Sequence, residues 1–200
     1  MTATATRKRA QAVPEGLTEA EFERLMDPSS VGDPRSSTYK RDRMLLELLA
    51  GTGLRINEAL SLTRLSVNLN RGSVWVAPEH SKTGKGRAVF YGPTLRGKLE
   101  AYLADMPAGQ DLLFVTRTGA ALSDSHVRRL FKKIARRAGL DPERVHPHAL
   151  RHLFALRTLD AGGHLNRLRS QLGHARISTT ATYLQAASWH RAEEAARLDL

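Results

Sequence analysis

The chain has 200 residues, and its 31 Lys and Arg side chains outnumber its 20 Asp and Glu side chains, giving a net charge of +11. This length suits one domain, and a hydrophobic content of 41% allows a packed core. The absence of cysteine excludes disulfides, thiolate metal sites and cysteine nucleophiles.

The charge predicts a polyanionic partner. Nucleic acid is the first candidate and an anionic membrane surface is the second, although many basic proteins are merely soluble. No stretch reaches the roughly 20 apolar residues that a membrane helix needs. The first residues are polar and basic, unlike a secretory signal. We therefore expect a cytoplasmic protein that binds nucleic acid and no membrane.

The chain divides into a basic arm and one domain. Residues 1–15 carry three consecutive cations among small residues and predict a disordered arm. We expect residues 16–200 to form a single domain. Thr18 and Glu21 have the spacing of a capping box, which predicts a short first helix. The Pro-, Ser- and Gly-containing segment 27–37 predicts a loop.

The domain alternates between helical and strand patterns. Apolar residues at helical spacing, such as Met44, Leu45, Leu48 and Leu49, predict helices over 38–50, 54–62, 93–105, 123–138, 147–161, 164–172 and 176–184 and from about 187. Turn residues separate three predicted strands over 67–69, 74–77 and 88–91. The run 112–115 is either an isolated strand or a loop. Together these elements predict a mainly helical α+β fold with a small three-stranded antiparallel sheet.

The helix predicted over 123–138 has an apolar side and a basic side. Its basic side carries six cations, namely Arg128, Arg129, Lys132, Lys133, Arg136 and Arg137. Cations on one face repel each other, whereas a phosphate backbone would neutralise them and release counterions. We therefore predict that these residues bind DNA, with a solvated basic face as the alternative.

Six further residues stand at informative places along the chain. Arg55 begins a helix after a Gly-Thr-Gly break, and Lys82 lies in the turn between two predicted strands. His148 and Arg151 are one turn apart on a helix, so both point the same way. His174 follows Leu-Gly, and Tyr183 lies nine positions later. Taken singly, each has an ordinary reading, as a surface arginine, a turn lysine, a capping histidine or a core tyrosine. Their combination in this order is very hard to obtain by chance.

Taken together, these motifs resemble the tyrosine recombinase (phage integrase) family over roughly residues 18–184. The resemblance implies the fold of that family's catalytic domain. It also implies a site-specific recombinase or integrase that attacks one DNA strand with a tyrosine oxygen and forms a 3′-phosphotyrosyl enzyme. A 5′-hydroxyl then attacks this intermediate and rejoins the DNA. Because the phosphotyrosine conserves the bond energy, the resemblance implies no ATP, no metal and no other cofactor.

The resemblance also implies a role for each residue. Arg55 and Arg151 match the two guanidinium groups that bind the phosphate, where planar forks suit the charge of the transition state. Lys82 matches the general acid that protonates the leaving 5′-oxygen, and we prefer it to the nearby Lys85 because the Ser-Lys-Thr-Gly turn fits the family pattern. The remaining matches are a proton-transfer group at His148, a phosphate donor at His174, the nucleophile at Tyr183 and a supporting acidic residue at Glu58.

Several alternatives stay open beside this reading. His148 and His152 are four positions apart and have zinc-ligand spacing; without cysteine or an intervening Glu we expect no metal. A related type IB-like topoisomerase would use the same residues. A non-catalytic or partner-dependent DNA-binding regulator is the alternative from another functional class.

The resemblance further implies a double-stranded DNA partner and a tetramer assembled on DNA, with a monomer in solution compatible with the sequence. Typical family members carry an N-terminal core-binding domain that closes over the DNA, and we expect it to be absent here. A naturally short protein, a fragment and dependence on another protein are the competing explanations. The tail 186–200, which contains Trp189, is expected to dock on a neighbouring protomer.

Overall fold

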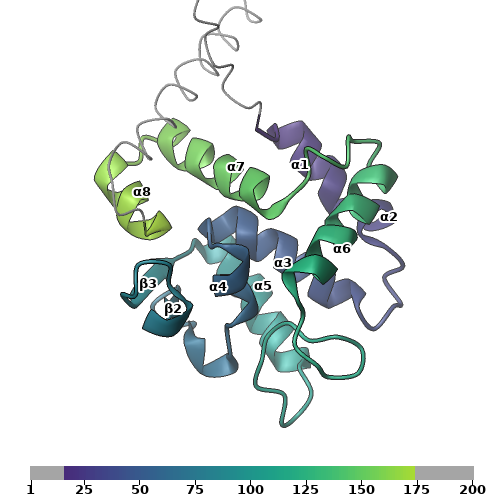
Figure 1. Ribbon diagram of the computed structural model, residues 1–200, viewed down its shortest axis with the longest axis horizontal. Helices are drawn as coiled ribbons and strands as arrows, with labels where there is room; N and C mark the ends of the chain where they lie inside the picture. The colour runs from purple at the N-terminus through teal and green to yellow at the C-terminus, as the bar shows by residue number, and fades with distance from the viewer. Residues whose placement is uncertain (1–15, 174–200) are drawn as a thin grey trace, which may run out of the picture.

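The computed structural model describes residues 16–173 of the chain. This part is mainly helical, with one small sheet at its side (Figure 1). The helices are α1 (Glu19–Met26), α2 (Pro28–Val31), α3 (Tyr39–Thr52), α4 (Ile56–Leu60), α5 (Pro93–Asp105), α6 (Asp124–Arg137), α7 (Pro147–Asp160) and α8 (Leu165–Leu172). The strands are β1 (Val67–Asn68), β2 (Ser73–Val76) and β3 (Arg87–Phe90), and the 3-10 turns are η1 (Arg64–Ser66) and η2 (Pro78–His80). The predicted fold class is confirmed.

The predicted arm, the last two predicted helices and the tail lie outside the described residues, as do His174 and Tyr183. Within the described part, no helix is both long enough and apolar enough to cross a membrane.

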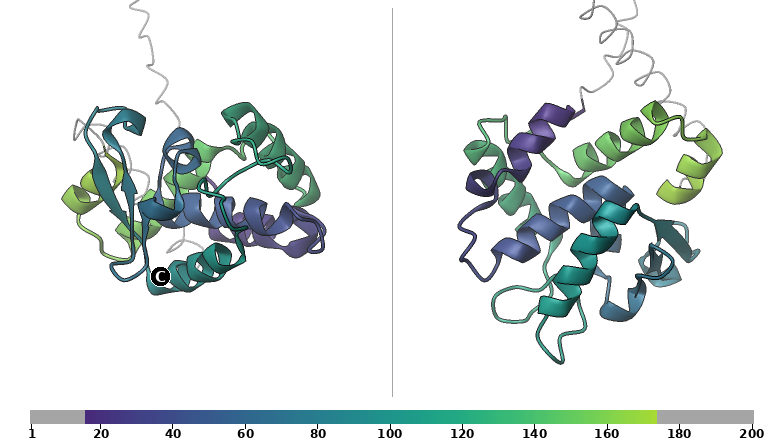
Figure 2. Two further views of the ribbon diagram at one scale, coloured as in Figure 1. Left: turned by 90° about the horizontal axis from the view of Figure 1, so that it is seen from below. Right: turned by 180° about the vertical axis from the view of Figure 1, so that it is seen from behind.

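Helix α3 lies at the centre of the fold and contacts α2, α4, α5 and α7. Every residue in 44–50 is buried, so the predicted stripe of Met44, Leu45, Leu48 and Leu49 is confirmed but is only part of the buried surface. Seen from behind in Figure 2, α3 and α5 lie side by side and the sheet sits beyond one end of the pair. The part of α3 over residues 44–50 is therefore covered on all sides, as expected for a central core helix.

The sheet is antiparallel, with strand order β1-β2-β3. Val74 and Val89 are paired and buried, whereas Trp75 faces outward. The strand β3 is at the edge, and α8 covers its free edge. The side chain of Gln171 accepts a hydrogen bond from the Phe90 backbone N at 3.1 Å and donates one to the Phe90 carbonyl oxygen at 2.5 Å. The edge strand is thereby fixed to the last described helix.

Two local predictions differ from the structure, and a third that was left open is decided by it. The predicted loop 27–37 contains α2, because the Asp27 side chain accepts a hydrogen bond from the Ser29 N at 2.8 Å and Val31 is buried near α6. The helix predicted over 54–62 is shorter, since α4 begins only after Arg55. The run 112–115, predicted as either an isolated strand or a loop, is a loop with two isolated antiparallel bridges, Thr63 with Leu112 and Val115 with Ala121.

Candidate active site

A groove of about 950 Å³ opens between the start of α4, the β2–β3 loop, the start of α7 and the end of α8. Four predicted catalytic residues line it together, namely Arg55, Lys82, His148 and Arg151. The predicted supporting residue Glu58 also lines it, as does Gly173, the residue before His174. The structure thus brings Arg55 together with Arg151, which lies 96 positions later in the sequence.

Arg151 is the most enclosed of these side chains, at 2% exposed. Its Nη1 donates to the Gly53 carbonyl oxygen at 2.6 Å and its Nη2 to the Leu172 carbonyl oxygen at 2.7 Å. Gly53 ends α3 in the left-handed conformation, and a β-carbon there would lie 2.4 Å from Phe154. A side chain at position 53 would therefore disturb the backbone that holds Arg151.

Arg55 is the residue before the first turn of α4, and Glu58 holds it from inside that turn. The Arg55 backbone N donates to Glu58 Oε2 at 2.9 Å, and its Nη1 donates to Glu58 Oε1 at 3.0 Å. The Arg55 guanidinium also donates to the carbonyl oxygens of Leu172 and Gly173, both at 3.4 Å. Arg55 is thus held by a contact with a residue only three positions later in the sequence.

A third arginine, Arg87 at the start of β3, was not predicted from the sequence. It donates to both carboxylate oxygens of Glu58, at 2.9 and 2.8 Å, and to the carbonyl oxygens of Gln171 and Leu172 at 3.2 and 3.5 Å. Its position two residues before the buried Val89, and so on the same face of the strand, is the only sequence signal that could have identified it. We call the meeting of Arg55, Arg87 and Arg151 at the end of α8 the arginine junction.

Glu58 is 1% exposed and lies within this junction. Burial by itself would raise the pKa of its carboxyl group. The hydrogen bonds from Arg87 and the Arg55 backbone, with the charges of both guanidinium groups, instead bring the pKa below its ordinary value. Glu58 is therefore ionised at neutral pH and can orient both arginines.

His148 is exposed at the mouth of the groove, in the first turn of α7. Partial burial and the positive charges of Arg151, Arg55 and Arg128, together with His146, lower its pKa. Its imidazole is therefore neutral at neutral pH and able to accept a proton. His146 caps α7 by accepting a hydrogen bond from the Ala149 N at 3.1 Å.

Lys82 is exposed on the β2–β3 loop. The Gly84 N donates to the Ser81 carbonyl oxygen at 3.0 Å, and Gly84 adopts a positive φ of 64°, which defines a tight turn around Lys82. Lys82 lines the groove, whereas Lys85 is not among the groove-lining residues. This placement favours Lys82 over Lys85.

The basic residues of α6 do not act as one uncompensated face. Arg128 lines the groove and pairs with Asp124 at 2.9 Å, and Lys132 pairs with Glu143 at 2.6 Å. Arg137 donates to the Val31 carbonyl oxygen at 3.3 Å. The other three predicted DNA contacts, Arg129, Lys133 and Arg136, are exposed. Ion pairs within the protein therefore neutralise part of the positive charge that the sequence analysis assigned to DNA binding.

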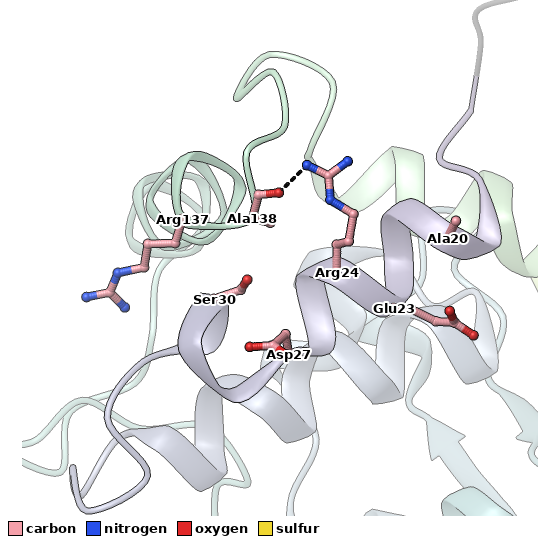
Figure 3. A pocket seen from close by; sticks show the side chains of 7 residues that line it. All are labelled: Ala20, Glu23, Arg24, Asp27, Ser30, Arg137 and Ala138. Carbon is pink, nitrogen blue, oxygen red and sulfur yellow. Dashed lines mark hydrogen bonds between the residues drawn. The ribbon is translucent and has the colours of Figure 1, made fainter.

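A second, smaller crevice of about 460 Å³ lies between α1, α2 and the end of α6 (Figure 3). Arg24 points toward the Ala138 carbonyl oxygen and donates to it at 2.5 Å, and Arg137 points away from the crevice. Glu23 and Asp27 lie on the same walls. Because its charged groups diverge or bind the protein itself, this crevice has no convergent set of reactive groups. In residues 16–173 no group of three or more His, Asp or Glu is arranged to hold a metal ion.

Comparison with known proteins decides the family. The sequence profile of the phage integrase family matches residues 15–190. The chain belongs to the phage integrase family. Tyrosine recombinase XerD of Xanthomonas campestris is 35% identical over 192 residues, which cover 90% of this chain and 58% of that protein. This phage integrase chain thus spans about three fifths of the length of that relative.

Solved structures of the same family share the fold. The XerH site-specific recombinase bound to a palindromic difH substrate, a post-cleavage complex, aligns with a TM-score of 0.73 at 29% identity, over 92% of this chain and 53% of that one. The catalytic domain of bacteriophage HP1 integrase aligns with a TM-score of 0.62 at 24% identity, over 91% of this chain and 93% of that one. The predicted phage integrase resemblance is confirmed, and the roles of individual residues stay predictions.

Proposed function

We propose that the chain is the catalytic part of a site-specific DNA recombinase that breaks and rejoins duplex DNA through a 3′-phosphotyrosyl intermediate. The observation that supports this most is the convergence of Arg55, Lys82, His148 and Arg151 in one groove. Because its substrate would be DNA, we propose that the protein acts in the cytoplasm, where that DNA lies.

The charge of the groove suits a phosphodiester. Its lining residues carry four cations, namely Arg55, Lys82, Arg128 and Arg151, and two carboxylates, Glu58 and Glu79. Because Arg55 and Arg151 are held by carboxylate and carbonyl oxygens, their guanidinium groups are ordered before a phosphate arrives. Ordered donors stabilise the charge that develops on the non-bridging oxygens without reorganising during the reaction.

The proposed proton transfers combine two residues of the groove, Lys82 and His148, with the roles that the family resemblance implies for Tyr183 and His174. The Tyr183 oxygen bonds to phosphorus, and the bond from phosphorus to the 5′-oxygen breaks. Neutral His148 assists removal of the tyrosine proton, Lys82 donates a proton to the 5′-oxygen, and His174 donates a hydrogen bond to the phosphate.

The other tyrosines fit the nucleophile's role poorly. The chain has four tyrosines, and Tyr39, Tyr91 and Tyr102 lie in the described part. None of these three lines the groove. Burial raises the pKa of Tyr102 to about 12, and its hydroxyl donates to the Leu113 carbonyl oxygen at 2.6 Å. Such a tyrosine is a poor source of phenolate, which supports Tyr183 as the nucleophile.

DNA binding is proposed to extend from the groove onto α6. Arg128 lies in the groove and the exposed Arg129, Lys133 and Arg136 continue from it along the helix. Contacts of this kind are to phosphates and carry little sequence information. We propose that four protomers assemble on two DNA sites, as the family resemblance implies.

A nicked suicide substrate tests the reaction. The DNA fragment downstream of the cut diffuses away and traps the covalent enzyme, and a library from DNA flanking the gene supplies the candidate sites. We expect a covalent band on a denaturing gel with the wild-type chain and none with Tyr183→Phe. Non-covalent binding without any covalent band would instead support a DNA-binding regulator.

A further inference from the structure

Arg87 contacts three elements of the fold. It starts β3, forms a fork with Glu58 of α4, and binds the carbonyl oxygens of Gln171 and Leu172 at the end of α8. The loop that carries Lys82 leads directly into β3. Arg87 therefore connects the Lys82 loop, the Arg55 turn and the end of α8.

Arg87 is enclosed and does not line the groove. Its side chain is 13% exposed, against 22% for Arg55. Gly173, which has a positive φ of 63°, lies directly against it, since a β-carbon there would be 2.8 Å from Arg87 Cζ. A side chain in this position is poorly placed to touch DNA but well placed to fix residues that do.

Glu58 distributes its two oxygens evenly between the two arginines. Oε1 accepts from the Nη1 of Arg55 at 3.0 Å and of Arg87 at 2.9 Å. Oε2 accepts from the Arg55 backbone N at 2.9 Å and from Arg87 Nη2 at 2.8 Å. The two-pronged contact from Arg87 sets the plane of the carboxylate, and that plane sets the direction of the Arg55 guanidinium.

We infer that Arg87 is a positioning residue for DNA strand cleavage, acting through Glu58 on Arg55. The inference rests on the proposed recombinase function. It assigns to Arg87 no contact with the DNA and no proton transfer. A lysine cannot replace it, because a single ammonium group lacks the planar fork.

The chain offers a matched control in Arg64. Its guanidinium also binds carbonyl oxygens near the end of a helix, those of Leu103, Met106 and Gln110, at 3.2, 2.7 and 3.1 Å. Arg64 is not among the groove-lining residues. Arg64→Gln thus removes a comparable structural contact without touching the arginine junction.

The test measures single-turnover formation of the covalent adduct at saturating DNA, DNA affinity and unfolding for Arg87→Gln, Arg87→Lys, Glu58→Gln and the double variant Arg87→Gln/Glu58→Gln. We expect Arg87→Gln to slow cleavage by about 10- to 100-fold, the loss expected for a charge-assisted hydrogen bond. The DNA affinity of Arg87→Gln should stay within about threefold of the wild-type value, and Arg64→Gln should cleave at the wild-type rate. Arg87→Lys should recover little of the lost cleavage rate. The double variant should cleave no more slowly than Glu58→Gln, because both changes break the same chain of contacts.

The pH profile provides a readout that a purely structural role would not move. Glu58 is faced by Arg55, the residue before α4, and by Arg87 from β3. Arg151 from α7 donates to the Leu172 carbonyl oxygen, which Arg87 also binds. Without Arg87, burial dominates and the pKa of the Glu58 carboxyl rises. Cleavage by Arg87→Gln should therefore fall further as the pH is lowered, and Glu58→Gln should abolish that added dependence.

The nitrogen-15 NMR signal of the Arg55 Nε–H group gives a readout that needs no cleavage. We expect it to shift and broaden in Arg87→Gln and to remain unchanged in Arg64→Gln. The inference would be overturned if the wild-type chain cleaves DNA and both Arg87 variants cleave it at the same rate. Additive losses in the double variant would overturn it as well. A wild-type chain that forms no adduct would contradict the proposed function, and the Arg55 signal would still show whether Arg87 orients Arg55. If Arg87→Gln does not fold, Arg87→Lys decides by the same criteria.

Discussion

Arginine side chains bind carbonyl oxygens at the ends of α6 and α8, and these two helix ends differ in what else the arginines contact. At the end of α6, Arg24 donates to the carbonyl oxygens of Ala138 and Gly139 at an exposed surface. At the end of α8, three arginines from three elements converge on the Leu172 carbonyl oxygen around a buried carboxylate. The first arrangement satisfies carbonyl groups that every helix leaves unpaired. The second concentrates positive charge beside a groove, which costs stability unless an anion binds there.

The comparison is tested most severely by Arg151→Gln. Removing this buried guanidinium should slow covalent adduct formation by about 1,000-fold, since it eliminates a donor to the transition state. It should also lower the free energy of unfolding by about 2 kcal/mol, because two charge-assisted hydrogen bonds are lost. Single-turnover cleavage and urea unfolding measure the two effects. A variant that loses stability but keeps its cleavage rate would show that Arg151 serves only the fold.

A smaller effect concerns the pH dependence of cleavage at the groove. Because the pKa of His148 is lowered, its imidazole stays neutral as the pH falls through the ordinary histidine value of about 6.5. The cleavage rate should therefore decline only at lower pH. Arg128→Gln removes one positive charge near His148 and should raise this pKa, moving the decline to higher pH. The measurement is the adduct rate against pH at saturating DNA, and an unmoved or oppositely moved profile would contradict the role of His148.

The smallest effect is expected at the other helix end. Arg24→Gln should lower the free energy of unfolding by about 1 kcal/mol, since exposed hydrogen bonds to a helix end contribute little. The cleavage rate should not change, because Arg24 lies at the crevice between α1 and α6. Urea unfolding and the adduct assay check both statements. A tenfold slower cleavage would mean that the crevice contributes to the reaction.

This contrast also explains what the sequence could predict. The helix predicted over 93–105 matches α5, and Glu58, which the family resemblance implied as a supporting residue, binds Arg55 only three positions away. Such features depend on neighbours a few positions away. Arg87 was missed because its partners, Glu58 and Leu172, lie 29 and 85 positions away. The helix α2 was missed for the same reason, since burial of Val31 near α6 stabilises a segment whose composition favours a loop.

The most direct test of the central claim is the identity of the residue that carries the trapped DNA. After cleavage of a suicide substrate, the adduct is digested with protease and nuclease, and the nucleotide-linked peptide is identified by mass spectrometry. We predict that the nucleotide is attached to Tyr183. Attachment to Tyr39, Tyr91 or Tyr102, or a wild-type chain that binds the DNA and leaves it uncut, would contradict the assignment of the groove as the active site.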